Sequence, residues 1–221
     1  MDKAATYALQ GAAALGGMAG AVALQRGAIS QYQKRGMKET GSAFTQPGFD
    51  AVLNQYEKQT GLSPEVTGNF SPRGTSYSRI GQNSISLNLD KASQFTLGHE
   101  LGHQEIEAGG GLPQWIQRHT YGGVNPNVIG LANVAIGAVS PSMRRATSLA
   151  LGLNYLNNSG RIFTEIEASR RGTQMLNAAG YPVSPIPGTF QAAGYVAAPA
   201  VTALAGLGAG RFLRAFASNL G

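Results

Sequence analysis

Two histidines flank a glutamate in the segment HELGH, residues 99–103, and they are two of only three histidines in the chain. His99 and His103 are four residues apart, so on an α-helix both imidazoles project from one face and can bind one metal ion. Glu100 lies one position further round, where its carboxylate can reach a water molecule without binding the ion. This pattern is typical of zinc hydrolases in which the glutamate is the general base.

A zinc site needs at least one more protein ligand. The chain has no cysteine, and the longer signature HExxHxxGxxH is incomplete, because Ile106 and Gly109 stand at its glycine and histidine positions. Glu107 and His119 are nearby alternatives as ligands, although neither has a spacing that favours it. His119 and Tyr121 are also candidates for a hydrogen-bond donor that stabilises the oxyanion of the reaction.

A better candidate for the third ligand lies in a second predicted helix, residues 161–176. Its two glutamates are two residues apart and therefore point to different faces of the helix. The residue four positions after a metal-binding carboxylate faces the same way and can orient a metal-bound histidine. Counting from Glu165 gives Ser169, which is short and polar. Counting from Glu167 gives Arg171, a poor neighbour for a dication, so we expect Glu165 to be the ligand.

The helix that carries HELGH is expected to start after Asp90 as its N-cap and to end at Gly109–Gly111. Gly98 and Gly102 are poor helix formers, but without side chains they allow another element to approach the metal-binding face. That element would be the helix that contains Glu165.

A β-hairpin is predicted just before this helix, over residues 75–89, with Gly81–Asn83 as its turn. Apolar and polar residues alternate in its second half. A strand beside the HELGH helix could hold a peptide substrate by strand addition. Further upstream, residues 40–48 read as a linker into a helix from about Phe49 to Thr60. The fold class expected is mainly α with a small β-hairpin.

HELGH followed about sixty residues later by EIEASRRG, residues 165–172, resembles the bacterial membrane-bound neutral zinc metallopeptidases. In that family an HExGH helix precedes a helix with the sequence Glu-aromatic-Asp-Ala-Ser-Arg-Arg. The resemblance implies a gluzincin-like packing of the two helices and a Zn²⁺ cofactor. By position it implies zinc ligands at His99, His103 and Glu165 and a general base at Glu100.

This chain departs from the family pattern at two positions near the motifs. Gln104 stands where the family tends to have alanine, and Ile166 replaces the aromatic residue. Looser similarity extends over most of residues 5–214, but only the two metal motifs are specific. The apolar segments are richer in glycine and alanine than those of the family.

Charged residues make up only 13% of the 221-residue chain, about half the usual share, and they leave long uncharged windows. Residues 4–25 are just long enough to cross a bilayer. Basic residues from Arg26 to Lys38 follow this window, so the positive-inside bias would place the catalytic domain on the cytoplasmic side of a membrane. The other windows are residues 120–143, 146–160 and 172–210.

Three regions are predicted from these windows and the motifs. Residues 1–40 form an apolar helix, either a membrane anchor or a packing helix, with a basic linker. Residues 41–188 form a zinc-peptidase-like domain, and residues 189–221 form a C-terminal apolar helix. Within the domain, an apolar hairpin at 124–160 is expected to be buried or interfacial and to pack through small residues.

The net charge of +6 is spread along the sequence, without a dense basic run or interleaved aromatic residues. This indicates affinity for an anionic membrane surface, and no nucleic-acid partner is expected. The apolar windows are also compatible with core helices of a soluble protein, a homo-oligomer or a larger assembly.

Two functions fit these observations. The first is a membrane-associated zinc-dependent endopeptidase, in which a metal-activated water attacks a bond of a peptide or protein substrate with Glu100 as general base. The alternative is a structural or membrane-penetrating assembly protein, such as a phage internal virion protein, that keeps a zinc-site fold. Zinc content and the effect of Glu100→Gln on peptide cleavage would separate the two.

Overall fold

The computed structural model describes most of the chain and divides it into two compact units. The described residues are 45–69, 76–79, 81–89, 92–121, 123–183 and 186–218, with Ala23 and Gly27 alone from the N-terminal region. Unit 1 comprises Met1–Gly27, Gly122–Ser159 and Ala193–Gly221, and unit 2 comprises Ala28–Tyr121 and Gly160–Ala192. The described residues are mainly helical with one small sheet, which confirms the predicted fold class at that level.

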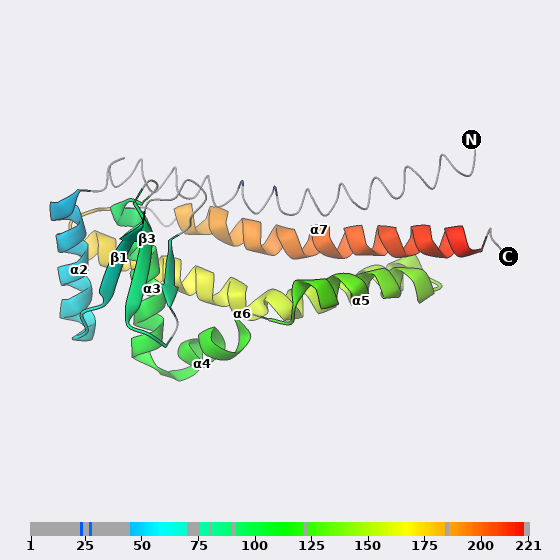
Figure 1. Ribbon diagram of the computed structural model, residues 1–221, viewed down its shortest axis with the longest axis horizontal. Helices are drawn as coiled ribbons and strands as arrows, with labels where there is room; N and C mark the ends of the chain where they lie inside the picture. The colour runs from blue at the N-terminus through cyan, green and yellow to red at the C-terminus, as the bar shows by residue number, and fades with distance from the viewer. Residues whose placement is uncertain are drawn as a thin grey trace. The chain divides into compact units, whose positions relative to one another are not determined.

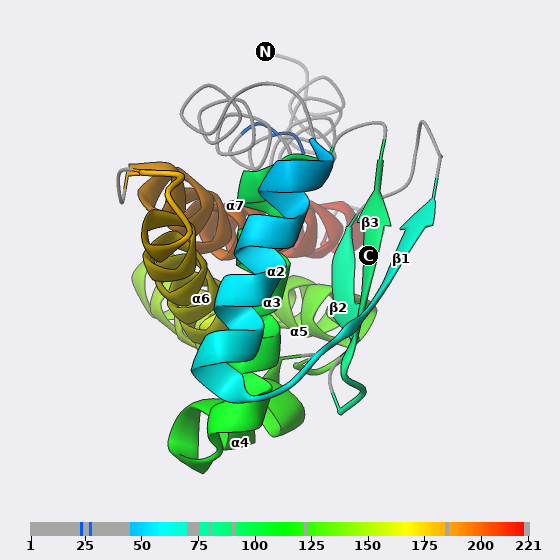
Figure 2. The same cartoon turned by 90° about the vertical axis from the view of Figure 1, so that its left-hand side faces the viewer.

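Unit 2 contains a three-stranded sheet made of β1 (Glu65–Asn69), β2 (Tyr77–Arg79) and β3 (Ser84–Asn88) in the order β1-β3-β2. The antiparallel pair of β2 and β3, joined through Gly81–Asn83, confirms the predicted hairpin. The parallel strand β1 was not predicted, because its sequence EVTGN has no apolar alternation. Figure 2 shows the three strands beside α2 and α3, with β2 at an edge of the sheet.

Two capped helices form the core of unit 2 with this sheet. Helix α2 (Gln46–Thr60) starts after the N-cap Thr45, three residues before the predicted start, and ends at Gly61, whose φ of 71° suits glycine. Its buried residues pack against α3, the inner face of the sheet and the end of α6. The residues of this core are Val52, Tyr56, Ile85, Leu87, Ala92, Phe95, Leu97, Leu101, Met175, Leu176 and Val183.

Helix α3 (Gln94–Gly109) carries the HELGH segment and is almost entirely buried along its first three turns. Its N-cap is Ser93, which forms a capping box with Thr96. The predicted N-cap Asp90 is therefore wrong, and that residue lies outside the described part of the chain. After Gly109, positive φ angles at Gly110 and Gly111 turn the chain into α4 (Gly111–Thr120), which packs back against α3.

Helix α6 (Met143–Ala178) contributes its second half, from Gly160 onward, to unit 2. Its backbone approaches that of α3 very closely. A Cβ atom at Gly102 would clash with the backbone of Ala168, and one at Gly172 would clash with the backbone of Gly98. Glycines of the HELGH helix therefore admit another helix, as the sequence predicts.

Unit 1 is formed by α5 (Pro126–Val139), the first half of α6 and most of α7 (Ile186–Ala217). Figure 1 shows α5 running along α7. Glycines make this approach close, since Gly137 and Gly210 have no room for a Cβ against the backbone of the opposite helix. The interior holds three alanines, one leucine and a hydrogen bond of 2.9 Å between the buried Asn154 and Asn133.

One described helical segment, Gly194–Ala217 in α7, is long and apolar enough to cross a membrane, while the apolar segment Val128–Val139 is shorter. The predicted windows 120–143 and 146–160 contain α5 and most of the unit 1 part of α6. The predicted N-terminal apolar helix within residues 1–40 falls almost wholly outside the described residues.

Candidate metal centre

Three buried side chains of unit 2 converge on one point. Nε2 of His99 lies 3.3 Å from Oε2 of Glu165, and Nε2 of His103 lies 3.9 Å from the same oxygen. The three ligand atoms are all within 4.8 Å of one another. Ligand atoms about 2.1 Å from a tetrahedral zinc ion are about 3.4 Å apart. The His99–His103–Glu165 group could therefore hold a metal ion, as the spacing of the two motifs predicts.

The Nδ1 atom of His99 faces the hydroxyl of Ser169 at 3.2 Å. That hydroxyl donates its own hydrogen to the backbone oxygen of Glu165 at 2.7 Å, so toward His99 it acts as an acceptor. The imidazole then carries a proton on Nδ1, so Nε2, which faces Glu165, is the nitrogen that could bind an ion. Ser169 thus contacts a histidine of the triad, as the four-residue spacing from Glu165 led us to expect.

A buried glutamine orients the second histidine. Oε1 of Gln117 accepts from Nδ1 of His103 at 2.9 Å, and Nε2 of Gln117 donates to the backbone oxygen of His103 at 3.0 Å. Both histidines therefore present Nε2 toward Glu165. Gln117 was not predicted as a site residue, because glutamine belongs to none of the metal motifs. Its approach to His103 depends on the turn at Gly110 and Gly111.

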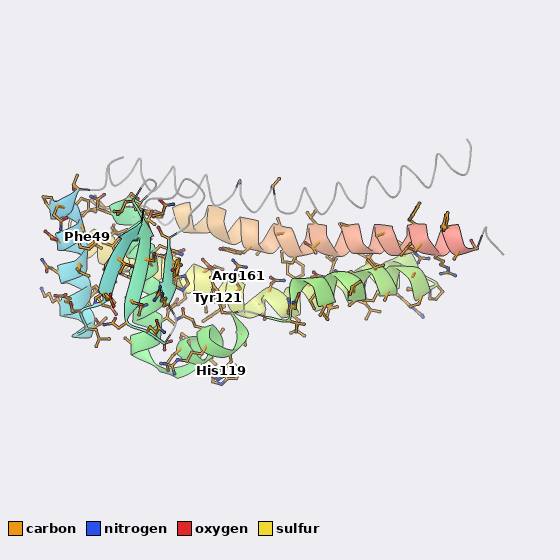
Figure 3. The ribbon with its side chains drawn as sticks, viewed as in Figure 1. Phe49, His119, Tyr121 and Arg161 are labelled. Atoms are coloured by element: carbon orange, nitrogen blue, oxygen red, sulfur yellow. The ribbon has the colours of Figure 1, made fainter. Side chains whose placement is uncertain are left out.

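Tyr121 holds the carboxylate of the third candidate ligand. Its hydroxyl donates a 2.5 Å hydrogen bond to Oε1 of Glu165, leaving Oε2 directed at the imidazoles. The guanidinium of Arg161 lies 5.6 Å from the centre of the Tyr121 ring, and Figure 3 shows these two residues side by side. Tyr121 is thus adjacent to the triad, in contact with one of its candidate ligands.

His119 does not belong to the converging group, contrary to its candidacy as a ligand or oxyanion donor. Its ring is exposed, stacks on Trp115 at 5.1 Å and bonds through Nδ1 to the Trp115 backbone oxygen at 2.8 Å. Figure 3 shows it at the outer side of α4. Glu107, the other alternative ligand, pairs with Arg118 instead.

The charges of the triad favour a bound cation. Burial opposes the ionised form of Glu165, but the hydrogen bond from His99, the charges of both histidines and the Tyr121 hydroxyl outweigh it and lower its pKa to about 2. Burial lowers the pKa of His103. For His99 burial acts in the same direction, but the hydrogen bond and charge of Glu165 prevail and raise its pKa. At neutral pH Glu165 is therefore a carboxylate, whose charge attracts the proton of His99 and would equally attract a metal cation.

Glu100 sits beside the triad with 7% of its surface exposed. Burial raises its pKa to about 7, against the charge of His99 and with the help of the charge of Glu165. The backbone N–H of Ser78, in β2, donates to its carboxylate. Glu100 therefore lies between the histidine pair and the edge strand, with a proton affinity suited to exchange at neutral pH.

Gln104 ties the hairpin to α3 next to this glutamate. Its Nε2 lies 2.5 Å from Oγ of Ser78 and within 3.3 Å of the backbone oxygens of Arg79, Gln82 and Ser84. An alanine here could make none of these bonds. The glutamine thus fixes β2 and its turn against the helix that bears Glu100.

Glu167 points away from the triad, as the two-residue offset from Glu165 predicts. Its carboxylate pairs with Arg170 at 2.6 Å and with Arg171 at 2.8 Å. The hydrogen bond from Arg170 has the largest effect on the pKa of Glu167. Together with the bond from Arg171 it outweighs partial burial and lowers this pKa to about 2. Glu167 therefore forms ion pairs with two arginines of its own helix, α6.

Comparison with known proteins identifies no relative. No protein-family model, no curated protein and no solved structure matches this chain. The case for a function rests on the arrangement of the buried side chains.

Proposed function

We propose that the protein is a membrane-associated zinc endopeptidase. The observation that carries the proposal is the convergence of His99, His103 and Glu165, with ligand atoms within 4.8 Å of one another, beside the buried carboxylate of Glu100. Two imidazoles and a carboxylate form the ligand set of the gluzincin type of zinc hydrolase. The close packing of the HELGH helix on the Glu165 helix supports the same assignment.

The ligand set supports zinc as the ion. Imidazole and carboxylate donors suit zinc, and three protein ligands leave a coordination position open for substrate or water. When bound, zinc would polarise the scissile carbonyl and lower the pKa of a water molecule. Ser169 and Gln117 hold the imidazoles through Nδ1 so that both Nε2 atoms face the site, and Tyr121 holds the carboxylate in place.

Glu100 is the proton carrier in this proposal. Its carboxylate accepts a proton from the attacking water and then donates it to the nitrogen of the leaving amine. A pKa of about 7 lets the same group do both near neutral pH. The hydrogen bond from the Ser78 backbone keeps the carboxylate oriented between steps.

The edge strand β2 offers a place for an extended substrate. It is a three-residue strand at one end of the sheet and packs next to α3. A peptide that added to β2 would run past Glu100, which already bonds to the β2 residue Ser78. This geometry supports a peptide as the substrate class.

Unit 1 supports association with a membrane. Its buried cluster consists of three alanines and one leucine beside a pair of asparagines, whereas many large apolar side chains, such as Leu131, Leu149 and Leu156, are exposed. Small-residue contacts and internal polar bonds are the means by which helices associate in lipid. The segment Gly194–Ala217 has the length for a span, and the basic residues from Arg26 to Lys38 favour the cytoplasmic side for the catalytic site.

The test combines metal analysis with peptide cleavage by the purified full chain. We expect about one zinc ion per chain, and we expect Glu100→Gln to keep the zinc while cleavage of a peptide library falls about 10²- to 10⁴-fold. Glu167→Gln is the matched control, since it also removes a glutamate charge but lies outside the triad. A chain without zinc refutes the proposal. If the chain holds zinc but cleaves no peptide, the enzymatic function is refuted. That result favours a membrane-penetrating assembly protein that keeps the zinc site.

A further inference from the structure

The described part of unit 1 carries charge of one sign only. Residues 123–159 and 193–218 contain no aspartate, glutamate or lysine, and their charged side chains are four arginines. These are Arg144, Arg145, Arg211 and Arg214. The acidic residues of the described chain all belong to unit 2.

The fold gathers these four arginines at one end of unit 1. Nε of Arg211 lies 3.1 Å from Sδ of Met143, the first residue of α6, and Arg214 donates to the backbone oxygen of Ser140 at 3.0 Å. Arg144 and Arg145 directly follow Met143. Figure 1 shows the turn between α5 and α6 beside the last turns of α7. We call this group of four residues the arginine end.

The arginine end has no internal counter-charge in the described chain. Arg144 and Arg145 are exposed in the first turn of α6, where the helix dipole disfavours cations. Every ion pair among the described residues lies in unit 2. Nη2 of Arg211 is buried and has no hydrogen-bond partner among the described residues. Within the described residues these positive charges are not balanced, and an anionic ligand would balance them.

Apolar side chains surround the same end and identify the kind of anion. Val139 is 76% exposed, Met143 and Leu213 are each 50% exposed, and Phe216 is 48% exposed. A soluble phosphate or a nucleic acid offers nothing to cover such groups. The boundary between lipid headgroups and acyl chains accommodates both, because arginine binds phosphate and apolar side chains enter the hydrocarbon.

We propose that the arginine end is a binding site for anionic phospholipid, in which Arg144 and Arg145 bind the headgroup phosphates, Arg211 and Arg214 add positive charge beside them, and the neighbouring apolar side chains contact the acyl chains. Arg214 has a second task, because its bond to Ser140 also closes the C-terminal end of α5. The two arginines that are free to face the lipid are Arg144 and Arg145. The site is independent of the proposed zinc peptidase function.

The experiment measures binding of phosphatidylglycerol and phosphatidylcholine to the full chain in neutral detergent micelles. We expect tighter binding of phosphatidylglycerol. Near an anionic surface each arginine contributes about fivefold, so Arg144→Gln with Arg145→Gln should weaken phosphatidylglycerol binding about 25-fold and leave phosphatidylcholine binding unchanged. The matched control, Lys58→Gln with Arg118→Gln, removes two cations from unit 2 and should have no effect.

Three results would overturn the proposal: equal affinity for the two lipids, an unchanged affinity in the double variant, or an equal loss in the control. Millimolar inorganic phosphate or a short DNA duplex that displaces phosphatidylglycerol would reassign the site to a soluble anion. The variant Arg144→Lys with Arg145→Lys keeps the charge and should retain most of the binding. Zinc content is measured in the same samples, and we expect it to be equal in all of them.

Discussion

The hydroxyl of Tyr121 donates a 2.5 Å hydrogen bond to the Glu165 oxygen that faces away from the histidines. This bond fixes the carboxylate so that its other oxygen completes the group with His99 and His103. Substituting Tyr121→Phe removes one hydroxyl and keeps the ring beside Arg161. We expect zinc affinity to fall about 10- to 100-fold, measured by competition with a chromogenic chelator. His119→Gln is the control, and an equal loss there would show that Tyr121 has no specific role.

Zinc affinity should depend on Gln117, although this residue belongs to no metal-binding motif. The change Gln117→Met keeps the volume of the side chain but removes the acceptor for Nδ1 of His103. The imidazole can then rotate or place its proton on Nε2, so zinc affinity should fall about 10- to 100-fold. Gln114→Met is the matched control, because Gln114 lies in the same helix as Gln117 but its side chain donates to the backbone oxygen of Glu107, away from the histidines. The role of Gln117 is refuted if both variants bind zinc like the unaltered protein.

The close approach of α3 and α6 should be sensitive to a single methyl group. Gly102→Ala places a Cβ against the backbone of Ala168, which cannot move aside as a side chain can. We expect a loss of about 1–3 kcal/mol in the free energy of unfolding together with weaker zinc binding, because Glu165 is displaced. Gly152→Ala has open space around its Cβ and should raise helix stability by up to about 1 kcal/mol. Chemical denaturation measures both variants, and equal stabilities would contradict the packing.

The pairing of Glu167 with two arginines predicts a pH dependence of stability. Its pKa is lowered to about 2 in the folded protein, compared with about 4.3 in an unfolded chain. Folding therefore favours the ionised carboxylate, and the resulting stabilisation is complete above about pH 5 and is lost as the pH falls toward 2. The Tm difference between the metal-free protein and Glu167→Gln should shrink over that range. A difference that stays constant with pH would contradict the ion pairs.

Local patterns in the sequence predicted the parts of the site that lie on regular helices. The four-residue spacing of His99 and His103, and that of Glu165 and Ser169, follows from helix geometry alone. The β2–β3 hairpin and the end of α3 at Gly109 could also be predicted from short stretches of sequence. Alternating apolar residues indicate a strand, and glycine commonly ends a helix.

The remaining features depend on contacts between distant segments. Gln117 and Tyr121 reach the triad because two glycines with positive φ return α4 toward α3. His119 lies in the same helix but faces away from the triad. Its candidacy as a ligand or oxyanion donor came from the residue type alone, which does not show the direction of the side chain. Strand β1 forms because it pairs with β3, and its own polar sequence does not predict this pairing.

The proposed function requires that His99, His103 and Glu165 bind one ion. X-ray absorption at the zinc edge of the purified full chain tests it directly. We predict two imidazole nitrogens and carboxylate oxygen at about 2.0–2.2 Å, with one imidazole lost in His103→Gln and no change in His119→Gln. A chain that takes up no zinc, or a zinc shell that is the same in His103→Gln as in the unaltered protein, would contradict it.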